Sequence, residues 1–313
     1  LGFPYLFLAF WHFFYFAMPS DRSKNLLFFH FIVILFGFTS VLGALISISA
    51  LPLVIYRMGL AAFGLALYFL VFHPNYFFLP RHLWSKVFLG GIIIGAHWVT
   101  FFYAIKIAGV SIALSMMATG ALITAILDPI INGRKLLGYE LIFGSLTSVG
   151  IGLIYQAEFK HIEGISIALF SALLSSLFTI LNGRMVKIGR PITLSFYELF
   201  VGSILGLIII LFSGQFTIES FELKDLDIFW ISILAFLCTS FAFNISIKVM
   251  RHLSSFTIMM VISLEPIYGI ILSLLIWNEK EYLSLNFYVG FLIVISSILM
   301  SGIYKLKKEA QKK

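Results

Sequence analysis

The sequence has little charge and almost no cysteine. Charged residues make up 11% of its 313 residues and hydrophobic residues 61%, against about 25% and roughly 45–50% in soluble domains. This composition excludes a soluble globular protein. Cys238 is the single cysteine, so the chain can form neither an intrachain disulfide nor a cysteine-based zinc site.

Several functional signatures are also missing. The chain has no Gly-rich phosphate loop of the Walker type, no Gly-x-Ser-x-Gly elbow and no His-Glu-x-x-His motif. We therefore expect no nucleotide hydrolysis by the chain itself, no metal and no cofactor. The hydrophobic runs do not alternate with polar residues as barrel strands do. The net charge of +7 comes from basic residues scattered in short connections, so no nucleic-acid partner is expected.

The hydrophobic residues fall in nearly uncharged windows, each long enough for a membrane-spanning helix of about 20 residues. The sequence predicts an all-α integral membrane protein. Its ten transmembrane helices are expected near residues 28–48, 52–72, 87–106, 111–131, 139–157, 164–183, 192–213, 228–248, 253–277 and 284–304.

Two short segments flank these spans: an N-terminal extension at 1–23 and a basic tail at 305–313. Residues 1–17 are apolar and aromatic without a basic leader, which is not typical of a signal peptide. Because Met18 stands just before Asp21, Arg22 and Lys24, we expect residues 1–17 to reflect a misplaced start. A short extra membrane-associated helix is the alternative.

The basic residues predict the orientation of the chain. With a cytoplasmic N-terminus, sixteen of the 21 lysines and arginines fall in cytoplasmic segments. Only Lys106, Lys160, Lys224 and Lys280 fall outside, and Arg57 lies within a span. By the positive-inside rule, both termini are expected in the cytoplasm.

The chain also contains an internal repeat. The first five spans align with the last five at an offset that drifts from about 140 to about 146 residues, pairing Phe38-Thr39 with Phe178-Thr179 and Tyr56-Arg57 with Tyr197-Glu198. An odd number of crossings inverts the second copy. Residues 24–158 and 164–304 are therefore predicted to form two inverted five-helix repeats, a construction that recurs in secondary transporters.

This duplication, with Leu264-Glu265-Pro266 and the later Asn278-Glu279-Lys280, resembles the EamA family of the drug/metabolite transporter superfamily over about residues 24–304. The first half departs from the pattern, because Gly120-Ala121 stands where the second half has Glu265-Pro266. The resemblance implies a permease of the bacterial inner membrane that exports an amino acid, a related metabolite or a toxic compound. An importer of the same fold is the alternative.

Glu265 is the strongest candidate for a transport role. It lies about thirteen residues into the ninth span, near the bilayer midplane, where an ionisable side chain costs about 2.5–3.5 kcal/mol. There it can contact a cationic or amine group or exchange a proton, and the alternative is a structural bond to a neighbouring helix. Pro266 beside it removes a backbone hydrogen bond and can kink the span.

Arg57 and Glu198 occupy equivalent positions in the two predicted repeats. Helical rise places each roughly 8–10 Å from its own membrane face, within a hydrocarbon core of about 30 Å. Because this difference in depth disfavours a direct salt bridge, we expect local partners for each and a gating or structural role. Direct substrate contact is the alternative.

The remaining candidates are polar or aromatic. His97 can titrate near neutrality and aromatic faces attract cations, although packing is an alternative for Trp98. Asp128 is expected to face the loop that contains Arg134. Gly144 and Gly150 suit either close helix packing or a homodimer surface. The further candidates for lining a central cavity, or for bonding between helices, are Tyr103, Thr39, Thr119, Thr179 and Asn244.

The functional prediction is a secondary transporter that moves a small organic molecule through the bilayer by alternating access, with proton coupling made plausible by Glu265 and Glu198. A membrane-embedded enzyme is the alternative from another class. It is disfavoured because the seven histidines are scattered and no nucleophile pairs with a base. A channel would need a repeated filter sequence or rings of charge.

Overall fold

A computed structural model describes residues 22–133, 135–157, 161–214, 216–224, 226–277 and 284–310. Several predicted features lie outside these described residues. They are the segment 1–17, Met18, Asp21, Arg134, Lys160, the motif Asn278-Glu279-Lys280, and the last three residues of the basic tail.

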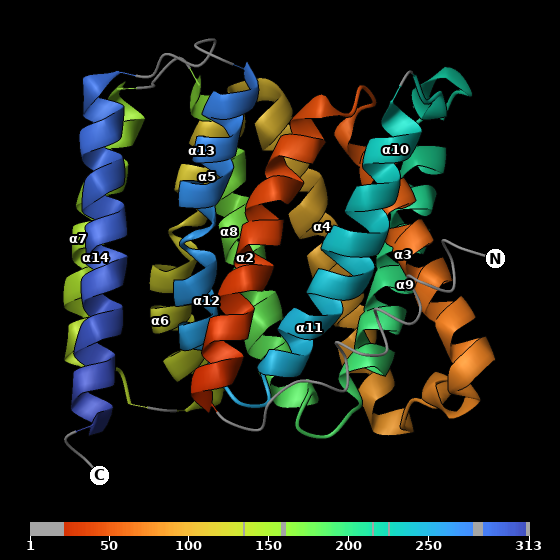
Figure 1. Ribbon diagram of the computed structural model, residues 1–313, viewed down its shortest axis with the longest axis horizontal. Coiled ribbons are helices and arrows are strands. Elements are labelled where there is room, and N and C mark those ends of the chain that lie inside the picture. Colours follow the sequence, from red (N-terminus) through yellow and green to blue (C-terminus); the bar gives the residue numbers. More distant parts are fainter. Residues whose placement is uncertain are drawn as a thin grey trace.

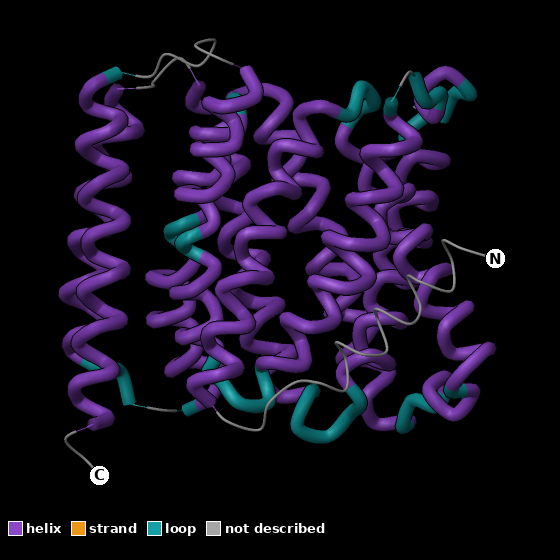
Figure 2. Tube along the Cα trace, in the orientation of Figure 1, coloured by secondary structure: helices purple, strands orange, loops and turns teal. Residues whose placement is uncertain are grey.

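The predicted all-helical fold is confirmed, since no strand occurs among the described residues (Figure 2). The helices of the first half are α2 (Arg22–Leu45), α3 (Ala50–Phe72), α4 (Trp84–Ala108), α5 (Val110–Met117), α6 (Gly120–Asn132) and α7 (Gly138–Ala157). Those of the second half are α8 (Ile162–Met185), α9 (Pro191–Phe212), α10 (Asp227–Ser232), α11 (Ala242–Val249), α12 (Ser255–Ile262), α13 (Glu265–Trp277) and α14 (Leu285–Ala310). Short 3₁₀ turns are η1 (Pro74–Phe77), η2 (Arg81–Leu83) and η4 (Glu219–Phe221), and η5 (Ile233–Phe241) is a π-helix.

Local signals explain several helix boundaries. Pro191 stands at the first position of α9, where its missing N–H is not needed. The hydroxyl of Ser254 accepts the Thr257 N–H and begins α12. Gly109, with φ of 87°, joins α4 to α5, and Gly133, with φ of 64°, ends α6. Both positions require backbone angles that glycine adopts without steric cost.

Nine segments within the described residues are long and apolar enough to cross a membrane. The predicted span at 139–157 corresponds to α7, which is helical but is not among these nine. Large apolar side chains remain exposed on the outer surfaces of the bundle, for example Phe212 at 88% and Leu275 at 74%. Such a surface suits lipid and not water.

The helices pack in pairs drawn from the two halves of the chain. At one end of the molecule α7 lies along α14, and at the other α3 lies along α9 (Figure 1). Between them α4 packs on α8 and α2 packs on α13. Gly144 and Gly150 belong to this internal packing, because a Cβ at these positions would meet Leu122 and the Gly290 carbonyl oxygen respectively.

Figure 1 shows that α2 begins and α14 ends at the same face, which is at the bottom of that view. We call it the lower face and the opposite one the upper face. At the upper face, the Asp227 carboxylate accepts hydrogen bonds from the Ser47 N–H at 2.9 Å and the Ser47 hydroxyl at 2.5 Å. Nearby, Lys106 Nζ donates to the Ile46 carbonyl oxygen. These contacts join the α2–α3 connection to the start of α10 and to the end of α4.

Three expected spans are not continuous α-helices. The fourth is interrupted between α5 and α6 at Ala118 and Thr119, and the ninth between α12 and α13 at Ser263 and Leu264. The eighth consists of α10, the π-helix η5 and α11. Pro266 does not kink the ninth helix in its interior. It is instead the second residue of a new helix, a position that tolerates proline.

Candidate functional site

A cavity of about 70 Å³ lies at the centre of the bundle. Its wall is formed by side chains from α2, α3, α4, α5, α8, α11, α12 and α13, so helices of both halves contribute. A volume of this size holds a few water molecules. The cavity is thus smaller than the pockets of roughly 300–1,000 Å³ that usually hold drug-sized organic molecules.

Arg57 on α3 provides a buried positive charge at this cavity. The side chain is 2% exposed. Its Nε donates to the Thr239 hydroxyl at 2.7 Å, and its Cζ lies 3.8 Å from the centroid of the Trp98 ring. Its Nη1 is buried without a hydrogen-bond partner. Burial of a guanidinium with an unsatisfied N–H group is energetically costly. The Nη1 of Arg57 is therefore available to donate a charge-assisted hydrogen bond to a ligand.

Thr239 is positioned by the π-helix. Its hydroxyl donates to the carbonyl oxygen of Leu234, five residues earlier, at 2.7 Å while it accepts from Arg57. Wide π turns are rare and occur often at functional sites. Sequence reasoning missed Thr239 as a site residue. The signal was the adjacent polar pair Thr239-Ser240 in a largely apolar span.

Glu265 lines the same cavity and is the first residue of α13. Its carboxylate forms no hydrogen bond and no ion pair with any described residue. It interacts electrostatically with Arg57 without touching it. The break before α13 places the carboxylate at a helix N-terminus, where the peptide dipoles stabilise negative charge. The cavity thus presents one positive and one negative group, each with bonding capacity left over.

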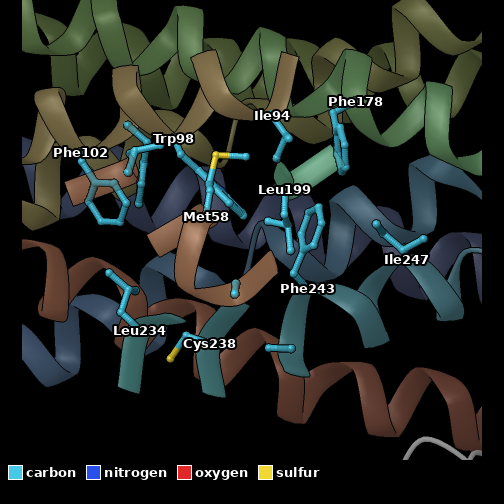
Figure 3. Close-up of a cluster of buried hydrophobic side chains, with 14 of the residues drawn as sticks. Met58, Ile94, Trp98, Phe102, Phe178, Leu199, Leu234, Cys238, Phe243 and Ile247 are labelled. Atoms are coloured by element: carbon cyan, nitrogen blue, oxygen red, sulfur yellow. The ribbon is translucent and has the colours of Figure 1, made fainter. Parts of the chain in front are cut away.

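Aromatic side chains form much of the remaining wall. Phe243 contacts both Trp98, edge to face at 5.3 Å, and Phe178, stacked at 5.5 Å (Figure 3). His97 stacks on Phe101 at 6.0 Å. The aromatic contribution of Phe178 and Phe243 was missed by sequence reasoning, because phenylalanine is abundant throughout the chain.

His97 is tied to the second half of the protein. Its Nδ1 lies 2.8 Å from the Ser171 hydroxyl and 3.0 Å from the Ser171 carbonyl oxygen. The Ser171 hydroxyl lies 2.8 Å from the His97 carbonyl oxygen. These contacts fix the ring between α4 and α8, so His97 joins the two halves beside the cavity.

Six of the eleven candidate residues line the cavity: Glu265, His97, Trp98, Arg57, Thr39 and Thr179. The other five lie elsewhere. Tyr103 is 42% exposed, and its hydroxyl donates to Glu163 at 3.3 Å near the upper face. Asp128 accepts a hydrogen bond from the Asn132 side chain at the lower end of α6. Asn244 accepts one from the Ser195 hydroxyl at 3.3 Å.

The last two candidates are buried behind the wall. Thr119 lies at the break before α6, and its hydroxyl has no partner. Glu198 is fully buried and accepts a hydrogen bond from Asn182 at 2.8 Å. Arg57 and Glu198 thus have separate hydrogen-bond partners, Thr239 and Asn182. Among the described residues, no group of three or more histidine, cysteine, aspartate or glutamate side chains could hold a metal ion.

Comparisons with known proteins concern the overall fold and the sequence of the second half. No curated protein matches the sequence. A solved crystal structure, described only as that of a protein, superposes with a TM-score of 0.68 at 14% sequence identity, covering 91% of this chain and 99% of the other. At this identity the likeness concerns the fold alone.

The sequence of the second half is more specific. The EamA-like transporter family matches residues 162–303, which contain the π-helix, both segments of the broken ninth helix and Glu265. The resemblance predicted from the sequence is therefore confirmed over this half: residues 162–303 of this multi-pass membrane protein match the EamA-like transporter family, which belongs to the drug/metabolite transporter superfamily.

Proposed function

We propose that the protein is a secondary transporter that moves a small zwitterionic organic molecule, such as an amino acid, through the central cavity. The observation that carries this proposal is the pair Arg57 and Glu265 on one aromatic-walled cavity. The free Nη1 of Arg57 suits the carboxylate of such a molecule, and the unbonded Glu265 carboxylate suits its ammonium group. Trp98 and Phe243 provide apolar surface for the side chain.

Alternating access is the proposed mechanism, and the helix bounds support the inverted repeat that it requires. Successive helices of the second half begin 140 to 147 residues after their counterparts. Helices α2 and α8 have 24 residues each, α5 and α12 have eight, and α6 and α13 have thirteen. Broken helices near the midplane are a recurring feature of such transporters.

One tyrosine of each half also donates a hydrogen bond to a loop of the other half. One of these bonds lies near the upper face and the other near the lower face. The Tyr56 hydroxyl on α3 donates to the Phe221 carbonyl oxygen at 3.0 Å near the upper face. The equivalent Tyr197 hydroxyl on α9 donates to the Phe77 carbonyl oxygen at 2.7 Å near the lower face. The two bonds form a reciprocal pair, and they support rocking of the halves about the cavity between them.

Localisation and direction belong to the same proposal. The concentration of basic residues near the lower face supports a cytoplasmic lower face and cytoplasmic termini, in the inner membrane of a bacterium. Export is the proposed direction. Proton coupling is proposed through the buried carboxyl groups Glu198 and Glu265. A homodimer has no support from Gly144 and Gly150, which pack inside the chain.

The test is untargeted mass spectrometry of culture medium and cell extract from a bacterial host. The host expresses the wild type, Glu265→Gln or the control Glu163→Gln, at matched levels in the membrane. Glu163 is exposed near the upper face and away from the cavity, so its substitution should leave transport unchanged. We expect a zwitterionic metabolite to accumulate in the medium with the wild type and the control, and not with Glu265→Gln.

Two other outcomes would change the proposal. Accumulation inside the cells would make the protein an importer. Export that is equal in all three strains would remove Glu265 from the binding site. Saturable counterflow of the identified metabolite in liposomes then separates a transporter from a channel.

A further inference from the structure

A second buried acidic group lies outside the cavity. Glu198 on α9 is fully buried, and its Oε1 accepts a hydrogen bond from Asn182 Nδ2 at 2.8 Å. Its Oε2 and the Oδ1 of Asn182 are also buried, and neither has a hydrogen-bond partner. Two acceptors are therefore left unused on two groups that are already joined by one hydrogen bond.

No basic side chain in the described part of the chain neutralises Glu198. The elements packed most extensively against α9 are α3, α4, α11 and η1. Their basic side chains are Arg57, Lys86, His97, Lys106 and Lys248, and none of these forms an ion pair or hydrogen bond with Glu198. Burial of an ionised carboxylate with a single hydrogen bond is strongly unfavourable. The Glu198 carboxylate is therefore better accommodated at this place when it is protonated and neutral.

Addition of one proton to Glu198 would turn one of the two unused acceptors into a donor. A protonated Oε2 becomes a donor, and Asn182 Oδ1 is an acceptor without a partner. A carboxylic acid and a carboxamide can then exchange two hydrogen bonds, with Nδ2 donating to Oε1 and Oε2 donating to Oδ1. We propose that Glu198 and Asn182 form a proton-binding site, separate from the substrate cavity, that couples transport to proton movement.

The placement of the pair explains how it can act on the cavity. Asn182 lies one turn beyond the cavity residues Phe178 and Thr179 on α8, and its Nδ2 is 3.5 Å from the Phe178 carbonyl oxygen. Loss of the proton would leave a charged Glu198 between α8 and α9. That charge favours a state in which water reaches the carboxylate, so the helices must move apart near the cavity wall.

The interface beside Glu198 is suited to such movement. A Cβ at Gly90 would lie 2.4 Å from Glu198 Oε1, and one at Gly91 would lie 2.8 Å from the Glu198 carbonyl oxygen. Glycine thus lets α4 of the first half approach α9 of the second half closely. In the proposed cycle, Glu198 takes a proton from water at one face and releases it to water at the other, so only its O–H bond forms and breaks.

The proton is measured directly by infrared spectroscopy of the full-length protein in lipid at neutral pH. We expect a carboxylic C=O band that is absent in Glu198→Gln, shifted in Asn182→Leu and unchanged in the exposed control Glu163→Gln. We also expect Glu198→Gln to melt within a few degrees of the wild type, because its amide can donate to Asn182 Oδ1 as the acid does. A wild-type spectrum without a band that depends on Glu198 would overturn the proposed site.

Coupling is tested in liposomes with a mixture of the standard amino acids as the probe. This part rests on the proposed transport function. We expect the wild type to accumulate a component of the mixture when a pH gradient is imposed, and Glu198→Gln to exchange that component without accumulating it. Accumulation by Glu198→Gln equal to that of the wild type would refute the coupling role. If the wild type moves no amino acid, the proposed substrate fails, while the infrared band still decides the proton site.

Discussion

The Ser263 hydroxyl lies 3.2 Å from the carbonyl oxygen of Ala118, to which it donates a hydrogen bond, so the interruptions of the fourth and ninth helices touch each other. The same O–H is shared with the Met259 carbonyl oxygen, 2.7 Å away on α12. A helix break leaves backbone groups without intrahelical partners. The contact with Ala118 joins the two breaks across the halves of the chain, two residues before Glu265.

Replacement of Ser263 by alanine should weaken this junction. Loss of a buried hydrogen bond costs about 0.5–1.5 kcal/mol, so we expect a small fall in melting temperature together with slower transport of the metabolite found by mass spectrometry. The control is Ser232→Ala, because the Ser232 hydroxyl is exposed and bonds only within its own turn. If Ser263→Ala and Ser232→Ala transport equally well, the junction has no role in the cycle.

Arg57→Lys should impair transport although it keeps the charge. Lysine lacks the planar fork that bonds Thr239 while it stacks on Trp98. With roughly 1.4 kcal/mol lost, affinity falls about tenfold, and we expect at least this loss in counterflow. Arg81→Lys is the matched control, since Arg81 is exposed near the lower face. Unchanged affinity in Arg57→Lys would show that the guanidinium does not contact the substrate.

Gly90→Ala should destabilise the protein, because its Cβ would lie 2.4 Å from Glu198 Oε1. Overpacking of this kind costs about 1–3 kcal/mol. Gly152→Ala on α7 is the control, since a Cβ there meets no atom within 4 Å. It should be neutral or stabilising by up to about 1 kcal/mol. Thermal unfolding in detergent measures both, and equal melting temperatures would contradict the close approach of α4 to Glu198.

The reciprocal tyrosines should control access to opposite faces. Tyr56→Phe removes the bond to Phe221 and should favour opening at the upper face, whereas Tyr197→Phe removes the bond to Phe77 and should favour opening at the lower face. A cysteine placed at the cavity residue Ser175, with the native Cys238 replaced by alanine, reports access to a membrane-impermeant thiol reagent. Modification of the two variants from the same side at equal rates would rule out this division of roles.

Sequence reasoning found the charged half of the cavity and missed part of its aromatic wall. Glu265 and Arg57 were identifiable because an ionisable residue in an apolar span requires protein or water around it. Thr239, Phe178 and Phe243 were not, because a hydroxyl or an aromatic ring can equally face lipid or a neighbouring helix. Tyr103 was misplaced for a related reason: its helix continues to the upper face, where its hydroxyl meets Glu163.

The break before Glu265 was partly visible in the sequence, since proline removes a backbone hydrogen bond and is best tolerated in the first turn of a helix. The break before Gly120 had no such signal. Pro129, which is present in that segment, lies inside α6. The Ala118 carbonyl oxygen at this break accepts its hydrogen bond from Ser263 of the other half, a contact that depends on the packing of the helices.

The sequence by itself determined that the chain lies in a membrane as a bundle of helices, because apolar runs of this length can satisfy their backbone hydrogen bonds there only as helices. It also determined which side chains are too polar to face lipid. Only the tertiary structure decided which of these polar side chains lie close together. Arg57 and Glu265 share a cavity, whereas Glu198 lies behind its wall with Asn182, because the rotation and depth of each helix are set by its neighbours and not by its own residues.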